Sequence, residues 1–224
     1  MKHSRLPEIV VPGKRLGRHI LHDPRSFGFA SPHTTLKSAS WKRHCLPFDQ
    51  GDVGSCTGNA MAGALMTEPF FKSGRILTEK DAVDLYSTAT HYDGVVGVYP
   101  PDDTGSSGLA VGKAAKKHGW IKSYHHAFGL NQTLAALVAS PVIIGIAWYE
   151  GFDKPQGHDA ELVIGGAPRG GHEIELLAVD LGKKQVRMCN SWGTGWGDHG
   201  YAVLSFATLE RLLNEDGDVV VPVQ

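Results

Sequence analysis

The sequence changes its pattern of apolar residues near Pro141, and this change restricts the folds open to the chain. Before that point, apolar side chains recur at the three- and four-residue spacing of helices. After it, short apolar runs broken by glycines are typical of strands. Helices followed by an antiparallel sheet favour an α+β fold, and 224 residues suffice for one large core or for two smaller lobes around a cleft.

The individual elements follow from periodicity and capping residues. Thr78 and Asp81 form a capping-box pattern at the start of one helix. Residues 1–40 show no sustained periodicity, so we expect an extended strap on the surface. The predicted helices cover residues 56–71, 78–90, 107–118 and 131–139, and the predicted strands include PVIIGIAWY, HEIELLAVD, KQVRMCN and GYAVLSF. We therefore expect one domain over residues 1–224, with a mainly helical lobe at about 56–130 and a mainly β lobe at about 131–224.

Charge and composition argue against several partners. The formal net charge is −1 and basic residues occur only in short groups, so we expect no nucleic-acid partner. The longest apolar runs are far shorter than the roughly 20 residues of a membrane-spanning helix, so we expect no membrane partner. We also expect a monomer. No His, Cys, Asp or Glu set has zinc-site spacing, and we expect neither a metal nor another cofactor.

The cysteines and the N-terminus point to a reducing compartment. Three cysteines, at positions 45, 56 and 189, are too few for a disulfide framework in a chain of this length. The N-terminus lacks the apolar central region and the cleavage site of a secretory signal. Both features favour a cytoplasmic protein.

Four residues supply the groups of a cysteine hydrolase. Cys56 lies where Gly54 and Ser55 lead into a helix, so that backbone N–H groups stabilise a thiolate. His172 is the candidate base, and the Asn190 side chain can fix the orientation of its ring. Gln50 can donate a hydrogen bond to an oxyanion. Trp192 is expected to shelter the histidine–asparagine bond from water and to border the substrate.

The short runs around Gln50, Cys56, His172 and Asn190 resemble those of the papain-like cysteine peptidases. That resemblance implies a helical left lobe, a β-barrel-like right lobe, a cleft between them, and hydrolysis through a thioester intermediate. The large inhibitory propeptide of the family has no counterpart in the 40 residues before Trp41, so the form looks microbial or viral. The matching runs are QGDVGSC at 50–56, Gly171-His172, NSWG at 190–193, GWG at 195–197 and Gly200-Tyr201.

The resemblance also implies substrate-binding positions. Gly105 and Ser106 match the stretch whose backbone pairs with an extended substrate. Glu173 matches a position that borders the pocket for the second residue before the scissile bond, where a carboxylate would favour Lys or Arg. An alternative from the strand pattern is that Glu173 and Glu175 are merely solvated.

Three functions remain open at this point. The first is an endopeptidase that acts on proteins or peptides. The second is a cell-wall peptide hydrolase, or a transpeptidase, that uses the same acyl-enzyme. The third is a non-enzymatic peptide-binding relative, which would not need a reactive Cys56.

Overall fold

The computed structural model describes residues 2–224 and has the α+β architecture that the sequence predicts. The helices are α1 (Cys56–Leu65), α2 (Glu79–Thr90), α3 (Gly108–Lys117), α4 (Gly129–Ala139) and α5 (Phe206–Asn214), with 3-10 helices η1 (Pro24–Phe29) and η2 (Glu150–Asp153). The strands are β1 (Lys2–Ser4), β2 (Ile20–His22), β3 (Ala39–Ser40), β4 (Ser123–His126), β5 (Val142–Tyr149), β6 (Pro168–Asp180), β7 (Gln185–Cys189), β8 (Tyr201–Ser205) and β9 (Asp218–Val223).

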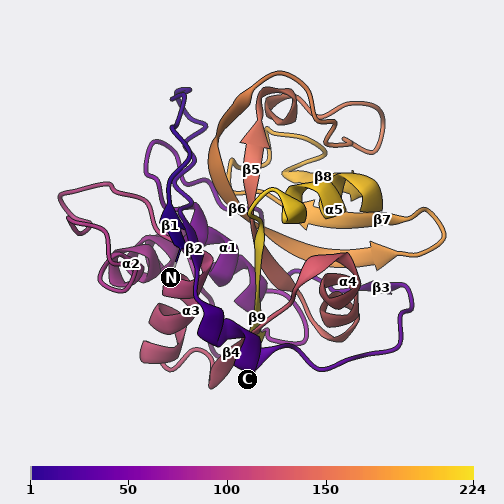
Figure 1. Ribbon diagram of the computed structural model, residues 1–224, viewed down its shortest axis with the longest axis horizontal. Coiled ribbons are helices and arrows are strands. Elements are labelled where there is room, and N and C mark those ends of the chain that lie inside the picture. The colour runs from indigo at the N-terminus through magenta and orange to yellow at the C-terminus, as the bar shows by residue number, and fades with distance from the viewer. Residues whose placement is uncertain (1) are drawn as a thin grey trace.

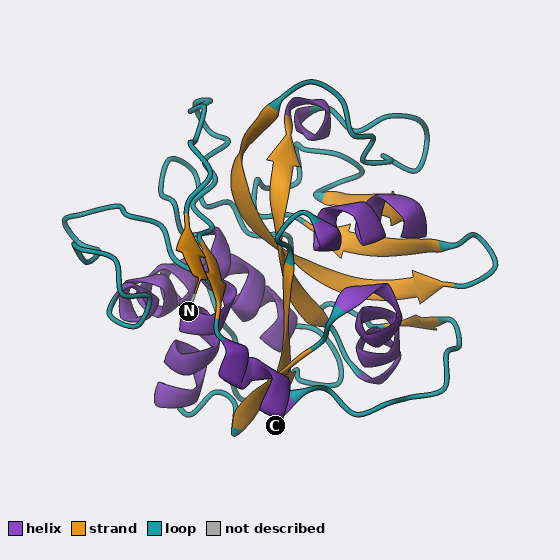
Figure 2. Ribbon diagram, in the orientation of Figure 1, coloured by secondary structure: helices purple, strands orange, loops and turns teal. Residues whose placement is uncertain are grey.

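A central antiparallel sheet separates two groups of helices. Its strand order is β4-β9-β5-β6-β7-β8, and β3 pairs with β6. Figure 2 shows α1, α2 and α3 on one side of the sheet and α4 and α5 on the other. We call the first side the helical lobe and the second the β lobe. None of the helices within residues 2–224 is long and apolar enough to cross a membrane.

Each lobe has its own apolar core, and the sheet contributes to both. Ile143 and Val220 pack into the core of the helical lobe, whereas Ile144 and Val219 pack into the core of the β lobe. Successive residues of a strand point to opposite faces, which explains how two neighbouring residues serve different cores. The sheet is therefore shared between the lobes.

Most predicted elements are confirmed, with changes at their ends. The capping box at Thr78 and Asp81 begins α2 as expected. The first helix ends at Leu65 rather than near residue 71, because Pro69 disfavours a helical conformation in the residue before it. Helix α5 and strands β4 and β9 were not among the predicted elements.

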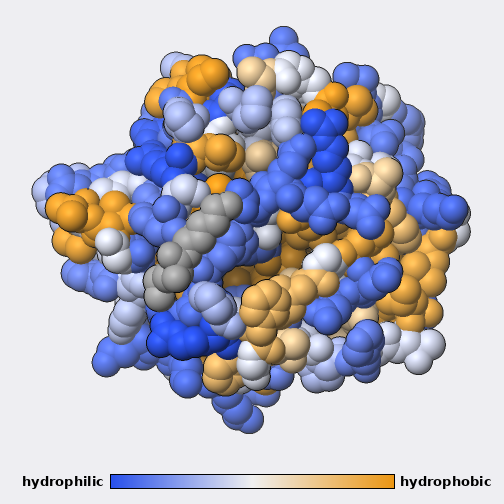
Figure 3. Space-filling model, viewed as in Figure 1, coloured by the Kyte–Doolittle hydropathy of each residue, from blue (hydrophilic) through white to orange (hydrophobic). Residues whose placement is uncertain are grey.

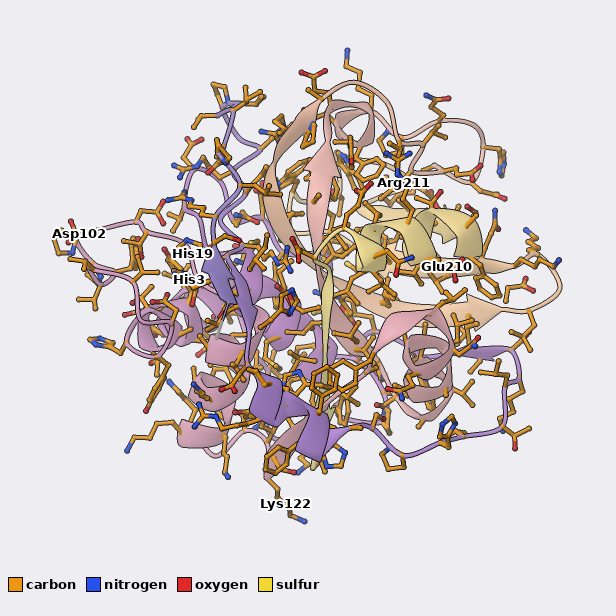
Figure 4. All side chains as sticks on the ribbon, in the orientation of Figure 1. His3, His19, Asp102, Lys122, Glu210 and Arg211 are labelled. Carbon is orange, nitrogen blue, oxygen red and sulfur yellow. The ribbon has the colours of Figure 1, made fainter. Side chains whose placement is uncertain are left out.

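The first forty residues do not simply lie on the surface, and that expectation is wrong for residues 16–21. The indigo segment in Figure 1 runs between the helices and the sheet. Leu16, Arg18 and Ile20 are 0%, 1% and 4% exposed. Figure 4 shows His19 beside His3, and their rings stack at 5.5 Å. We keep the word strap for residues 2–40.

Exposed apolar side chains gather elsewhere. Figure 3 shows an apolar patch at the left edge of the molecule, over the loop that follows α2. Val96 in this loop is 97% exposed. The patch is separate from the buried residues that the sequence analysis singled out.

Candidate active site

Cys56 is the first residue of α1 and is fully buried. The backbone N–H groups of Glu173 and Thr57 lie near its sulfur, so the thiol faces strand β6 at the residue that follows His172 in the sequence. Burial, together with the nearby Glu173 carboxylate, raises the pKa of the Cys56 thiol, while the two N–H donors act in the opposite direction. In this closed arrangement the thiol is therefore protonated at neutral pH.

His172 makes the hydrogen bond that the sequence predicts. Its Nε2 lies 2.7 Å from Oδ1 of Asn190, which also accepts from the Ser191 N–H at 2.8 Å. Because an amide oxygen only accepts, Nε2 carries the proton and Nδ1 of the neutral ring is left as an acceptor. Nδ1 is buried and has no hydrogen-bond partner within the described residues. Burial lowers the pKa of His172 to about 3.

Two tryptophans pack against the His172 ring. Trp192 lies 5.2 Å from it between ring centroids and is 6% exposed. Trp148 meets the ring edge-on at 4.8 Å. Sequence reasoning missed Trp148, because its place depends on the β5–β6 register, in which Ile146 pairs with His172. Together the two rings restrict both the motion of the imidazole and its access to water.

Gln50 is held beside the same residues. Its Oε1 accepts a hydrogen bond from Ser191 Oγ at 2.6 Å. Its Nε2 donates to the Val53 carbonyl at 2.8 Å and reaches the carbonyl of Leu16 at 3.4 Å. The backbone carbonyl oxygen of Leu16 in the strap thus lies beside the Gln50 side-chain amide, which the sequence analysis expects to donate a hydrogen bond to the oxyanion of the substrate.

The strap is hydrogen-bonded through its backbone to both lobes. The N–H groups of Gly17 and Arg18 donate to the Gly171 carbonyl at 3.1 and 2.9 Å. Ser106 donates to the Gly17 carbonyl at 2.8 Å and accepts from the His19 N–H at 2.6 Å. A Cβ at Gly17 would overlap the Gly54 carbonyl. Ser106, predicted to pair with a substrate, therefore pairs with a segment of the chain itself, whereas the Gly105 N–H donates to the Tyr86 hydroxyl at 2.9 Å.

Glu173 and Glu175 are not solvated, so that alternative is wrong. They are 0% and 1% exposed and project from β6 toward the helical lobe. Glu175 forms an ion pair with Arg43 and accepts from Thr67 Oγ1 at 2.6 Å. Alternating residues of β6 point to opposite faces of the sheet, but the sequence alone does not show what covers each face. It therefore could not distinguish a face exposed to solvent from a face buried against a second lobe.

Arg169 joins the strap to the β lobe through hydrogen bonds, and the sequence analysis did not single it out. Its Nη1 and Nη2 donate to the carbonyls of Ile9 and Lys14 at 2.7 and 2.9 Å, and its Nε donates to Asp153 at 3.2 Å. The guanidinium also lies over the Trp192 ring at 5.6 Å.

No three His, Cys, Asp or Glu side chains within residues 2–224 gather in a way that could hold a metal ion.

The two-lobed arrangement, with Cys56 on a helix of one lobe and His172 on a strand of the other, is the papain-like cysteine protease fold. Xylellain, a cysteine protease from Xylella fastidiosa, matches with a TM-score of 0.72 and 18% identity over 96% of this chain and 99% of its own. Procathepsin L 3 of Tenebrio molitor larval midgut matches with a TM-score of 0.61 and 16% identity over 88% and 74% of the two chains. A recombinant stem bromelain precursor matches with a TM-score of 0.59 and 13% identity over 97% and 76%. No protein-family profile matches the sequence, and no curated protein is similar to it in sequence.

Proposed function

We propose that the protein is a cysteine endopeptidase that hydrolyses peptide bonds in proteins or peptides. The observation that carries this proposal is the His172–Asn190 hydrogen bond of 2.7 Å, together with a thiol at the start of α1 that lies near Glu173, the neighbour of His172 in the sequence. We assign Nδ1 of His172, which has no hydrogen-bond partner within the described residues, as the acceptor for the Cys56 proton. We expect a monomer that needs no cofactor and that works where its thiol stays reduced, as in the cytoplasm.

The reaction uses two half-steps. The Cys56 sulfur attacks the substrate carbonyl, while His172 holds the thiol proton and then gives it to the leaving amine. Water then attacks the thioester, His172 accepts a proton from that water, and the acid product and free thiol are restored. Asn190 keeps the ring oriented, and Gln50 donates to the carbonyl oxygen as negative charge develops there. Gly105, Ser106, Glu173 and Trp192 border the bound peptide.

The test is covalent labelling followed by turnover. An epoxysuccinyl peptide is added under reducing conditions to the intact chain and to Gly17→Ala, in which the new Cβ pushes the strap away from Gly54. We expect a stoichiometric adduct on Cys56, located by peptide mass spectrometry, and none on the buried Cys189. The His172→Ala variant should suppress the adduct, and Cys56→Ala should not hydrolyse unfolded protein. Normal turnover by Cys56→Ala would refute the proposal, and hydrolysis of purified peptidoglycan alone would favour a cell-wall enzyme.

A further inference from the structure

Tyr86 and Asp103 form a hydrogen-bonded pair near the nucleophile, and the proposed bond cleavage assigns a role to neither. Tyr86 lies in α2 and is fully buried, and its hydroxyl donates to Asp103 Oδ1 at 2.6 Å. Asp103 lies in the loop between α2 and α3. The Gly54 N–H donates to Asp103 Oδ2 at 2.9 Å and to Oδ1 at 3.1 Å. Two elements that are distant in the sequence therefore meet at the residue two positions before Cys56.

Two glycines let the pair approach the start of α1. A Cβ at Gly58 would overlap the Ala82 carbonyl and lie 2.9 Å from the Tyr86 Cβ, so α1 and α2 pack backbone against backbone here. A Cβ at Gly54 would lie 2.9 Å from Asp103 Oδ1, which is closer than such atoms approach. Any larger residue at position 54 would push the carboxylate away from the N–H that it binds.

The peptide group between Val53 and Gly54 connects Asp103 to Gln50. Its N–H belongs to Gly54 and donates to Asp103, whereas its oxygen belongs to Val53 and accepts from Gln50 Nε2 at 2.8 Å. Because a peptide group is planar, bonds to its N–H and to its oxygen fix the same plane. Rotation of this group would turn the Val53 oxygen away from Gln50. The Asp103 carboxylate thus holds in place the oxygen that binds the Gln50 amide.

The direction of the Gln50 amide depends on both of its ends. Ser191 Oγ donates to Oε1 at 2.6 Å, and the Val53 oxygen accepts one N–H of Nε2. An amide nitrogen carries two N–H donors, so the second is left for the oxyanion of a substrate. If the Val53 oxygen moves, the nitrogen end of the amide loses its anchor and the second donor loses its direction.

The Tyr86 hydroxyl also joins this network to the stretch that is expected to pair with a substrate. It accepts from the Gly105 N–H at 2.9 Å while it donates to Asp103, and a phenol can do both at once. Burial, and then the hydrogen bond to Asp103, raise the pKa of the Tyr86 phenol. The phenol therefore stays protonated at neutral pH and keeps donating to the carboxylate.

We propose that Asp103 and Tyr86 are positioning residues, which hold the Gln50 side-chain amide in the direction that stabilises the oxyanion of the transition state. This inference rests on the proposed peptidase function. Both residues act through the peptide group between Val53 and Gly54 rather than by contact with the substrate.

The charge of Asp103 can be separated from its position as an acceptor. A carboxylate near the Cys56 thiol opposes ionisation of that thiol, so a role of the charge alone predicts faster turnover in Asp103→Asn. Positioning needs only an acceptor oxygen, and Oδ1 lies within reach of both Tyr86 and Gly54. We therefore expect Asp103→Asn to keep kcat within about threefold of the parent, whereas Asp103→Ala loses both hydrogen bonds.

The first experiment compares kcat with KM. Every variant is made in the full-length Gly17→Ala protein, because Arg15 of the strap also reaches Asp103 at 3.4 Å and the strap must be displaced equally in all of them. Initial rates on fluorophore-labelled, unfolded casein give both constants. Asp103→Ala should lower kcat about tenfold and Tyr86→Phe about threefold, with KM changed by less than about twofold, because an oxyanion donor acts in the transition state. An unchanged kcat in Asp103→Ala would overturn the inference.

Neighbouring residues supply matched controls. Asp102 directly precedes Asp103, is exposed, and lies at the outer end of the same loop in Figure 4. Tyr92 is 37% exposed. Asp102→Ala and Tyr92→Phe should keep the kcat of the parent, and circular dichroism checks that each variant is folded. If Asp103→Ala does not fold, Tyr86→Phe carries the test, since it removes a single oxygen and leaves Asp103 in place.

A double-mutant cycle distinguishes positioning from a general loss of structure. If Asp103 acts through Gln50, its removal has little effect once the Gln50 amide is gone. We expect Asp103→Ala to lower kcat about tenfold when Gln50 is present and less than about twofold in Gln50→Ala. Equal losses in the two backgrounds would show that Asp103 does not act through Gln50, and the inference would be wrong.

Amide exchange separates this inference from the proposed function. In isotopically labelled protein, NMR should show the Gly54 N–H exchanging at least tenfold faster in Asp103→Ala than in the parent, and at the parent rate in Asp102→Ala. Casein hydrolysis with equal kcat in Asp103→Ala and the parent refutes the positioning role and leaves the peptidase intact. Faster exchange at Gly54 without casein hydrolysis by the parent refutes the peptidase, and the positioning role with it, but keeps the hydrogen bond to Asp103.

Discussion

Removing the Arg43 guanidinium tests how strongly one buried ion pair joins the two lobes. Arg43 and Glu175 are 4% and 1% exposed at their side chains, and Thr67 donates to the second carboxylate oxygen at 2.6 Å. Loss of one partner from a buried pair costs about 3–5 kcal/mol, because the other charge stays buried. At about 2–4 °C of melting temperature per kcal/mol for a domain of this size, Arg43→Met should melt roughly 6–20 °C lower.

The loss should depend on pH in a stated direction. Burial raises the pKa of Glu175 even with Arg43 present, and removal of the cation raises it further. A carboxyl whose folded-state pKa exceeds its unfolded value binds its proton more tightly in the folded state, so stability falls as pH rises through that window. The loss of folding stability in Arg43→Met is therefore largest above the raised folded-state pKa of Glu175, and it shrinks as the pH falls toward the unfolded-state pKa of that carboxyl.

Thermal unfolding at pH 5 and pH 8, followed by circular dichroism, measures both effects. Arg43→Met/Glu175→Leu should recover much of the lost stability, because no unpaired charge stays buried. Lys80→Met breaks a solvent-exposed pair with Asp84 and should change the free energy of unfolding by less than about 1 kcal/mol. If Arg43→Met melts within 2 °C of Lys80→Met at pH 8, the pair does not join the lobes as described.

The remaining predictions concern the site. Gln50→Ala should lower kcat by about 10²–10³, measured on the strap-released Gly17→Ala protein, because an oxyanion donor is lost; an unchanged kcat would remove Gln50 from the mechanism. Cys56 in the unchanged chain should alkylate at pH 5 no faster than a denatured thiol, because burial raises its pKa; rapid reaction at pH 5 would contradict this. Gly145→Ala, whose new Cβ would overlap Arg18 Nε, should release the strap and speed alkylation of Cys56 at pH 7.5, whereas Gly195→Ala, with nothing within 4 Å of its new Cβ, should not.

The sequence predicts the hydrogen-bonded residues of the site better than it predicts their surroundings. His172 and Asn190 lie in short runs whose chemistry is local, and their bond is present at 2.7 Å. The start of α2 was predictable for the same reason, since its capping box needs only Thr78 and Asp81. Local signals of this kind do not depend on which strands pair.

What sequence reasoning missed depends on distant pairing. Arg18 Nε donates to Asp218 Oδ1 at 3.1 Å although the two are 200 residues apart, and nothing in either neighbourhood indicates the other. The strap carries no apolar period, so its burial follows from the backbone hydrogen bonds that Gly17 makes with both lobes rather than from hydrophobic patterning. Trp148 was missed because the β5–β6 register is not encoded locally.

The place of β9 in the sheet has a consequence for the order of assembly. Residues 123–149 contain both β4 and β5, yet these strands do not pair, because β9 lies between them. Until residues 218–223 are available, both strands present open edges that could pair with each other in a non-native register. The same segment carries Asp218, so a nascent chain holds its nucleophile and base before it holds the acidic partner of Arg18. The central sheet is therefore completed only by the strand that also binds Arg18 of the strap.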